Sequence, residues 1–149
     1  MARPKQVDSK VPRGKAAFHT LLPAAAFLLG EPAGPFVVLA VGLIMTASVA
    51  GGPKFSVFGR LFNRVIRPTL KIKPGSPEEA APHLFAEALG ALFLLASAAA
   101  LFLAATTLGW ALALLVVVLA ALNWLAGICV GCQTYLIIAR LRGRAKVAA

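Results

Sequence analysis

Residues 84–139 run LFAEALGALFLLASAAALFLAATTLGWALALLVVVLAALNWLAGICVGCQTYLIIA, an apolar stretch that holds no lysine or arginine and only one acid, Glu87. A helix that crosses a bilayer needs about 20 mostly apolar residues, so this stretch is long enough for two crossings. The Thr106–Gly109 segment predicts a tight connection between spans over 84–108 and 110–139. The sequence therefore predicts an all-α fold embedded in a membrane.

Two shorter apolar stretches precede it. Residues 35–52 contain no lysine or arginine and predict a further span. Residues 16–30 contain His19 and Pro23, but their leucines and phenylalanines make them too apolar for a surface loop, and the turn-like segment 31–34 follows. We interpret 16–30 as a short first span; the alternative is a cleavable signal peptide, because a basic leader precedes it. The expected architecture is an integral membrane bundle of four transmembrane helices.

The composition favours a membrane protein and excludes several other classes. Of the 149 residues, 60% are hydrophobic and 13% are charged, and the mean hydropathy is +0.85. These values exclude a disordered chain, a nucleic-acid-binding arm and an ordinary globular enzyme with a polar surface. The expected partner is therefore the lipid bilayer and not a nucleic acid.

Positive charge is confined to three segments, which are the tail 1–15, the loop 53–83 and the tail 140–149. Because short basic segments stay on the cytoplasmic side of a membrane, all three are expected there. Four spans satisfy this condition, whereas three uncleaved spans would place one basic tail outside. We therefore expect a multi-pass protein of a plasma membrane with both termini in the cytoplasm.

The cytoplasmic loop begins with an amphipathic segment. Between residues 54 and 71, apolar side chains recur at helical spacing and basic side chains fall off their face. This pattern predicts an interfacial helix on the inner leaflet that Pro68 ends or bends. Arg64 and Arg67 are candidate ligands for anionic lipid headgroups or, as a more specific site, for an anion or a thiolate.

Cys129 and Cys132 are the candidate chemical groups of the chain. Residues three apart on one helix share a face at about 5 to 6 Å, close enough for a disulfide after modest adjustment. A reactive thiol needs a helix start or a nearby cation, and a helix break at Gly127 or Gly131 would supply the first. Redox or sulfur chemistry, inert packing and metal binding all remain open for this pair. The Gly127-x-x-x-Gly131 spacing also indicates helix packing, within the chain or in a homo-oligomer.

Three other side chains lie toward the same side of the membrane. His19, His83 and the two cysteines form a possible Cys2His2 set for zinc, although their spacing matches no recognised finger pattern. Glu87 is an intramembrane acid and thus a functional candidate; it either reaches the interface or pairs with Arg64, Arg67 or His83. No cofactor is expected, because no nucleotide-binding, haem or quinone signature is present.

The order of these features resembles a bacterial membrane-protein family catalogued as domain of unknown function 4395. The resemblance covers most of the chain and rests on segments 62–68, 82–87 and 123–135, of which the last is the most specific. It implies a multi-helix membrane protein without an assigned activity. Genes of such a family often lie near genes for thioredoxin-like proteins and sulfurtransferases, which implies a sulfur or thiol role.

The leading hypothesis is a membrane thiol-redox or sulfur-handling component. In it, Cys129 and Cys132 cycle between dithiol and disulfide, or carry a persulfide, and exchange with a cytosolic thioredoxin-like or sulfurtransferase protein. One alternative is a small transporter, or a subunit of one, in which Glu87 and the cysteines line a path for a sulfur-containing anion. The other alternative is a purely structural helical bundle.

Overall fold

The computed structural model describes residues 6–52 and 55–143. Its elements follow one another along the chain, and short π-helical segments, named η2 and η3, interrupt the α-helices. They are β1 (Gln6–Asp8), α1 (Lys10–Leu29), α2 (Ala33–Gly51), α3 (Val57–Leu61), η2 (Phe62–Ile66), α4 (Arg67–Thr69), β2 (Pro77–Glu79), α5 (Ala80–Phe102), α6 (Thr106–Ala121), η3 (Leu122–Ala126) and α7 (Val130–Leu141).

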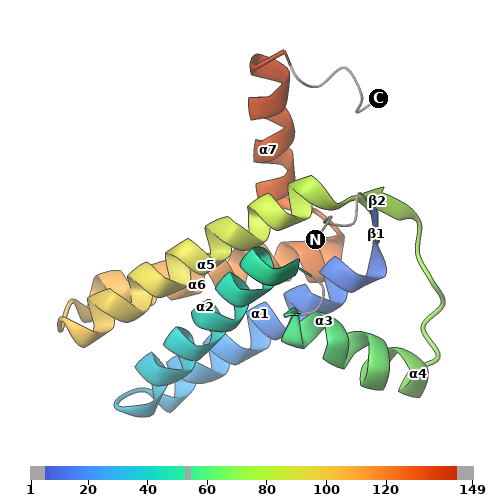
Figure 1. Cartoon of the computed structure of the whole chain (residues 1–149). Coiled ribbons are helices and arrows are strands. Elements are labelled where there is room, and N and C mark those ends of the chain that lie inside the picture. The colour runs from blue at the N-terminus through green and yellow to red at the C-terminus, as the bar shows by residue number, and fades with distance from the viewer. Residues whose placement is uncertain (1–5, 53–54, 144–149) are drawn as a thin grey trace.

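The long helices α1, α2, α5 and α6 form an up-and-down bundle (Figure 1). Leu94 of α5 and Val38 of α2 are fully buried at its centre, and smaller side chains such as Ala98 and Ala113 let the helices approach closely. Gly109 also belongs to this packing, since Ser97 donates a hydrogen bond of 2.6 Å to its carbonyl oxygen. The expected helical bundle is therefore present.

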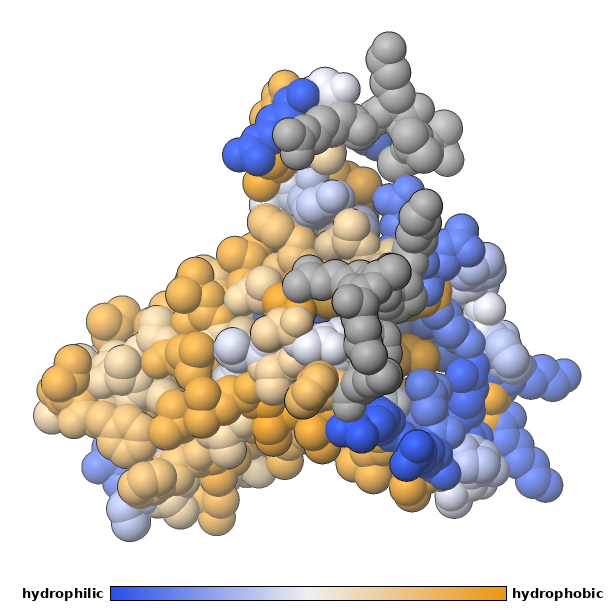
Figure 2. Space-filling model, in the orientation of Figure 1, coloured by the Kyte–Doolittle hydropathy of each residue, from blue (hydrophilic) through white to orange (hydrophobic). Residues whose placement is uncertain are grey.

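The outside of the bundle is apolar. Leu28, Leu92, Leu125 and Val118 are all more than half exposed, and Figure 2 shows a broad hydrophobic surface over the long helices. Large exposed apolar patches mark surfaces that meet something other than water. Helix α2, helix α5 and the run 106–126 are each long and apolar enough to cross a membrane, which indicates a membrane protein.

Helix α1 is the span of the sequence-based model that does not meet the same criteria. It packs against α2 and α6, as a bundle helix should, but Lys10, Arg13 and Lys15 occupy its first two turns. Its apolar part is correspondingly short. Within residues 6–52 and 55–143, three helices thus have the length and composition of a membrane span.

Two boundaries expected from the sequence were wrong. The connection between α5 and α6 lies at 103–105 and not at Thr106–Gly109, because Thr106 starts helix α6 and Gly109 is a contact glycine. A Cβ atom on Gly109 would lie 2.5 Å from Leu101 of α5, so its small size serves helix packing and not a turn. The stretch 110–139 is also not one helix, since the chain breaks after Ala126 and α7 projects away from the bundle (Figure 1).

The loop between α2 and α5 contains the expected helical segment, which runs through α3, η2 and α4. Its apolar face does not point to one side only. Phe58 and Phe62 are buried against α1, where Phe58 stacks on Phe18 with ring centroids 5.1 Å apart and Phe62 covers Gly14. Leu61 and Val65 remain exposed. Pro68 lies next to the end of the helix at Thr69, near the expected stop.

A small sheet, absent from the sequence-based expectation, joins the N-terminal segment to the end of this loop. Strands β1 and β2 pair antiparallel, with Val7 opposite Glu78 and Asp8 opposite Pro77. The sheet lies at the end of the bundle where α5 begins (Figure 1). It therefore brings acidic residues of two distant segments close to the start of α5.

Candidate redox site at the start of helix α7

The site begins with a helix break. Gly127 has a φ of 71°, in the left-handed region that glycine adopts at little cost, and its N–H donates to the carbonyl of Asn123 at 3.1 Å. This arrangement ends the helical run of 106–126. The next residues, Ile128 and Cys129, connect to the first turn of α7. A break at Gly127 was one of the two that the sequence suggested.

Cys129 is the N-cap residue of α7. Its backbone is extended, and its Sγ accepts a hydrogen bond of 3.3 Å from the backbone N–H of Cys132. The two cysteines form a disulfide with their Cα atoms 5.2 Å apart, and both are half-buried. The prediction that both share one helix face was therefore wrong, because Cys129 lies just outside the helix. A cysteine in this position faces the N–H groups of the first turn, which favour a thiolate.

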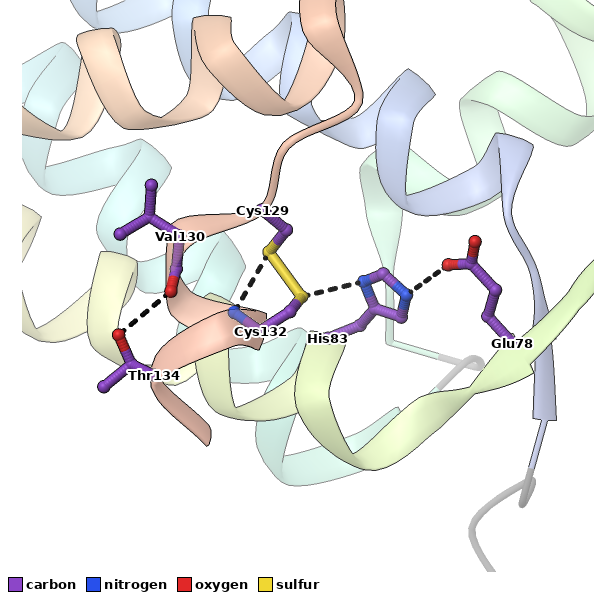
Figure 3. The surroundings of a disulfide bond; sticks show 6 residues. All are labelled: Glu78, His83, Cys129, Val130, Cys132 and Thr134. Atoms are coloured by element: carbon purple, nitrogen blue, oxygen red, sulfur yellow. Dashed lines mark hydrogen bonds and ion pairs between the residues drawn. A yellow bond between two sulfur atoms is a disulfide. The ribbon is translucent and has the colours of Figure 1, made fainter. Parts of the chain in front are cut away.

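His83 is placed beside the disulfide (Figure 3). Its Nδ1 lies 3.4 Å from the Sγ of Cys132, and its Nε2 lies 2.8 Å from a carboxylate oxygen of Glu78. An ionised carboxylate only accepts hydrogen bonds, so the Nε2 atom carries a proton and a neutral His83 presents the lone pair of Nδ1 to the sulfur. A base oriented by a third group is the arrangement that activates nucleophiles.

Glycine at position 131 lets α7 meet α5 at this point. A Cβ atom on Gly131 would lie 2.6 Å from the Cβ of Ala86, so no larger residue fits without a shift. Ala86 follows His83 by one helical turn, and this close crossing therefore sets the approach of Cys132 to His83. Gly127 and Gly131 are not on one helix, which rules out their use as a joint helix-contact motif.

The small sheet and Asp8 hold Glu78 in place. Asp8 accepts hydrogen bonds of 2.9 Å from the backbone N–H groups of Lys10 and Gly75 and pairs with the Arg67 guanidinium. Burial disfavours the charged carboxylate, but these hydrogen bonds and the charge of Arg67 outweigh it and lower the pKa of Asp8. The N-terminal segment, the loop helix and β2 are thus joined at one carboxylate.

Glu87 has a partner that the sequence did not suggest. Its Oε2 atom lies 2.6 Å from the Nζ of Lys15, which also donates to the Ser48 hydroxyl at 3.2 Å. The expected partners Arg64, Arg67 and His83 are wrong, because the packing of α1 places Lys15 next to Glu87. Both side chains of the pair are largely buried, and they line a cavity of about 480 Å³ that extends to Cys129.

The other predicted residues lie apart from the cysteines. Arg67 is engaged with Asp8 and Asn63, whereas Arg64 is exposed and makes no hydrogen bond or ion pair within residues 6–52 and 55–143. Of the Cys2His2 set, the ligand atoms of His83, Cys129 and Cys132 lie within 4.8 Å of one another. His19 is not among them; it packs edge-on against Phe58. A four-ligand zinc site from these residues is therefore not assembled, and both sulfur atoms are committed to the disulfide.

Sequence reasoning missed Glu78, Asp8 and Lys15. Each lies in a polar stretch next to a predicted span, where acidic and basic residues look like ordinary solvated charge. The scarcity of acids was the available signal. In a chain with 15 basic and 5 acidic residues, each carboxylate is a candidate for a specific ion pair or hydrogen bond. Four of those acids, Asp8, Glu78, Glu79 and Glu87, lie at the end of the bundle that holds the cysteines.

The comparisons with known proteins agree with the resemblance noted in the sequence. The family described as Domain of unknown function (DUF4395) matches residues 7–140, so the chain belongs to this family. The match includes all the long helices, both cysteines and His83. No curated protein and no solved structure matches the chain significantly.

Proposed function

We propose that this protein is a membrane thiol–disulfide exchange component in which Cys129 and Cys132 cycle between disulfide and dithiol. The observation that carries the proposal is the placement of the pair at a helix start with the Nδ1 of His83 3.4 Å from Cys132. Inert packing cysteines need neither a helix N-terminus nor an oriented base. The pair has both.

The exchange balances with a dithiol protein of the thioredoxin-like class as the partner. One partner thiol gives its proton to His83 and attacks the Sγ of Cys132; the S–S bond breaks, and Cys129 leaves as a thiolate accepted by the N–H of Cys132. The second partner thiol then attacks the first, which releases Cys132. Cys132 takes the proton from His83, and the second proton passes to Cys129. The partner is oxidised by two electrons, and the cysteine pair is reduced by two.

The proposal also places the protein in a bacterial plasma membrane with four spans and the site at the cytoplasmic face. The charge distribution supports this orientation. The loops at 30–32 and 103–105 contain no lysine or arginine, whereas the basic residues lie at the opposite end of the bundle. Helix α1 qualifies as the short fourth span because Lys15 turns its charge inward to Glu87 instead of facing lipid. Labelling of single cysteines placed at Lys10 and Lys73 in a Cys129→Ala/Cys132→Ala background tests this orientation.

The direct test of the exchange is reduction of the purified protein by reduced thioredoxin in detergent micelles. The mass shift after alkylation counts the thiols, and two should appear together. His83→Ala should slow the reaction roughly 100-fold by removing the proton acceptor. Glu78→Ala should also slow it, whereas Glu79→Ala, on the neighbouring exposed residue, serves as the control. A protein that thioredoxin leaves oxidised, or equal rates in all four proteins, would contradict the proposal.

Transport of a sulfur-containing anion is the second candidate, and the cavity next to Lys15 and Glu87 is the observation that favours it. The charges that line the cavity make transport of an anion the weaker candidate. Lys15 is neutralised by Glu87 and Arg67 by Asp8, so the inner cavity offers little net positive charge to an anion. Uptake of labelled thiosulfate into proteoliposomes that depends on Glu87 would move this candidate to first place.

A further inference from the structure

We infer that the cavity beside the cysteine pair binds a quinone, which takes two electrons from the reduced cysteines. This inference rests on the proposed thiol exchange and names the electron acceptor. The cavity has a volume of about 480 Å³, within the range that encloses small organic ligands. Helices α1, α2, α5 and α6 line it together with β1, the loop helix, η3 and the start of α7. Met45, Phe93, Val116 and Leu119 give its inner part a largely apolar wall.

A buried histidine that lines this cavity points to a ligand. His19 is only 8% exposed, and its Nε2 atom has no hydrogen-bond partner within residues 6–52 and 55–143. A buried polar atom without a partner is unfavourable, so such atoms are normally satisfied by protein, water or ligand. The Nε2 atom itself has almost no accessible surface, so a molecule in the cavity would meet it after a rotation of the His19 ring.

The two cysteines differ in their relation to this cavity. Cys129 lines it, together with the Lys15–Glu87 pair and Ser48, whereas Cys132 contacts His83. A thiolate on Cys129 therefore faces the cavity after a protein partner has reacted at Cys132. The site has one sulfur for the soluble partner and one for the occupant of the cavity.

The lining selects the class of occupant. The wall is apolar and the buried charges are paired, so a neutral ring system fits better than an ion. Oxygen atoms on that ring would meet polar groups of the inner part of the lining, among them His19 on α1 and Ser48 with Lys15 near Glu87. A neutral apolar ring that carries oxygens and also accepts two electrons from a dithiol is a quinone.

The electron transfer balances without a further reactant. The Cys129 thiolate adds to the quinone ring, forming a carbon–sulfur bond, and the ring takes up one proton. The Cys132 thiolate then attacks the Sγ of Cys129, which forms the disulfide and breaks the carbon–sulfur bond; the electron pair stays on the ring, which takes a second proton. The dithiol is oxidised to the disulfide, its two protons reach the oxygens, and the quinone is reduced to quinol.

Binding is tested separately from electron transfer. The Cys129→Ser/Cys132→Ser protein in detergent micelles should bind decylubiquinone or menadione saturably, measured by equilibrium dialysis. Adding His19→Phe should weaken binding about tenfold, as expected for the loss of one buried hydrogen bond. Leu119→Trp, which narrows the cavity from α6, should weaken it as well. Leu21→Phe, on the exposed side of α1, is the matched control and should leave the affinity unchanged.

Electron transfer is then measured with the reduced wild-type protein, as quinol formation against loss of two thiols. One quinol per cysteine pair, together with His19-dependent binding, is the expected result. Absence of saturable binding, or binding without thiol oxidation, would overturn the inference. If in either case thioredoxin still reduces the cysteine pair, the proposed thiol exchange stands and only the quinone is wrong; if the pair does not exchange at all, the proposed function fails first.

Discussion

The two ends of the helix bundle differ in almost every property. At one end, three-residue connections at 30–32 and 103–105 join long helices, and Glu31 is the only charged residue in them. At the other end, a sheet, a helical loop, a helix break and paired charges surround the cysteines. Apolar packing is enough to build the first end, whereas the second needs polar contacts that cost free energy unless each has its partner. The end that needs paired polar contacts is the one that holds the cysteine pair.

The buried pair of Lys15 and Glu87 is where the contrast is strongest, so breaking it should have the largest effect. Glu87→Leu leaves the Lys15 ammonium buried without a partner and should destabilise the protein by about 3 to 5 kcal/mol. The double change Lys15→Met/Glu87→Leu should recover most of that loss, because no charge is stranded. Thermal unfolding in detergent measures both, with Lys10→Met as the control; equal stability of the single and double variants would contradict the pairing.

The crossing of α7 over α5 comes next. Gly131→Ala should lower the free energy of unfolding by about 1 to 3 kcal/mol, because the added methyl overlaps Ala86. It should also slow the reduction of the disulfide, because it moves α7 away from His83. Gly90→Ala is the matched control, since its Cβ would meet only the flexible tip of Met45 at 2.7 Å. The measurement is the rate of reduction by thioredoxin. If both variants react alike, the position of α7 does not set the reactivity of Cys132.

Loss of the Asp8 carboxylate, which binds Lys10, Gly75 and Arg67, should lower stability by a smaller amount that depends on pH. The pKa of Asp8 is lowered in the folded protein, so its contribution to stability is fully present above the usual carboxyl pKa of about 4 and is lost as the pH falls from there through the lowered pKa. We expect Asp8→Asn to lower the free energy of unfolding by about 1 to 2 kcal/mol at pH 7 and by progressively less as the pH falls below about 4. Hydrogen exchange of β1 and β2, corrected for intrinsic rates, measures the difference. A penalty that grows toward low pH would be the wrong sign.

The exposed arginines of the loop helix should contribute least. Arg64→Gln should weaken retention of anionic lipid by about 1 kcal/mol and leave thiol exchange unchanged. Arg67→Gln should instead release Asp8 and loosen β1 and β2, because its guanidinium is already engaged. Native mass spectrometry of co-purified lipid, together with hydrogen exchange of the sheet, separates the two. An equal effect of both variants on lipid would mean that Arg67 is also a headgroup ligand.

The sequence predicts one end of the bundle much better than the other, for a physical reason. A span is a local property of about 20 apolar residues, so 35–52 and the core of 84–108 are visible in composition alone. The pairing of β1 with β2 joins residues about 70 positions apart, and the partner of Glu87 depends on how α1 and α5 pack. Neither can be obtained from periodicity. The place of α1 in the bundle is equally hard to predict, because the basic residues at its start shorten its apolar stretch and their pairing depends on how the helices pack.

Only the local features of the candidate site could be predicted from the sequence. The Cys-x-x-Cys spacing and a break at Gly127 are local features, and both are present in the structure. His83 was identified only as one member of a possible metal set, because its contact with Cys132 depends on a close crossing at Gly131 and Ala86. Glu78 could not be recognised at all without the sheet that positions it.

The most direct measurement is a redox titration of Cys129 and Cys132 in a glutathione series, with alkylation and intact-mass detection of the thiols in the native protein. We expect a reversible two-electron couple in which both thiols appear together and the oxidised fraction changes from one tenth to nine tenths over about 60 mV. Thiols that resist a membrane-permeant alkylating reagent until the protein is denatured, or a pair that does not respond to the glutathione ratio, would contradict a redox role and leave packing as the function of the cysteines.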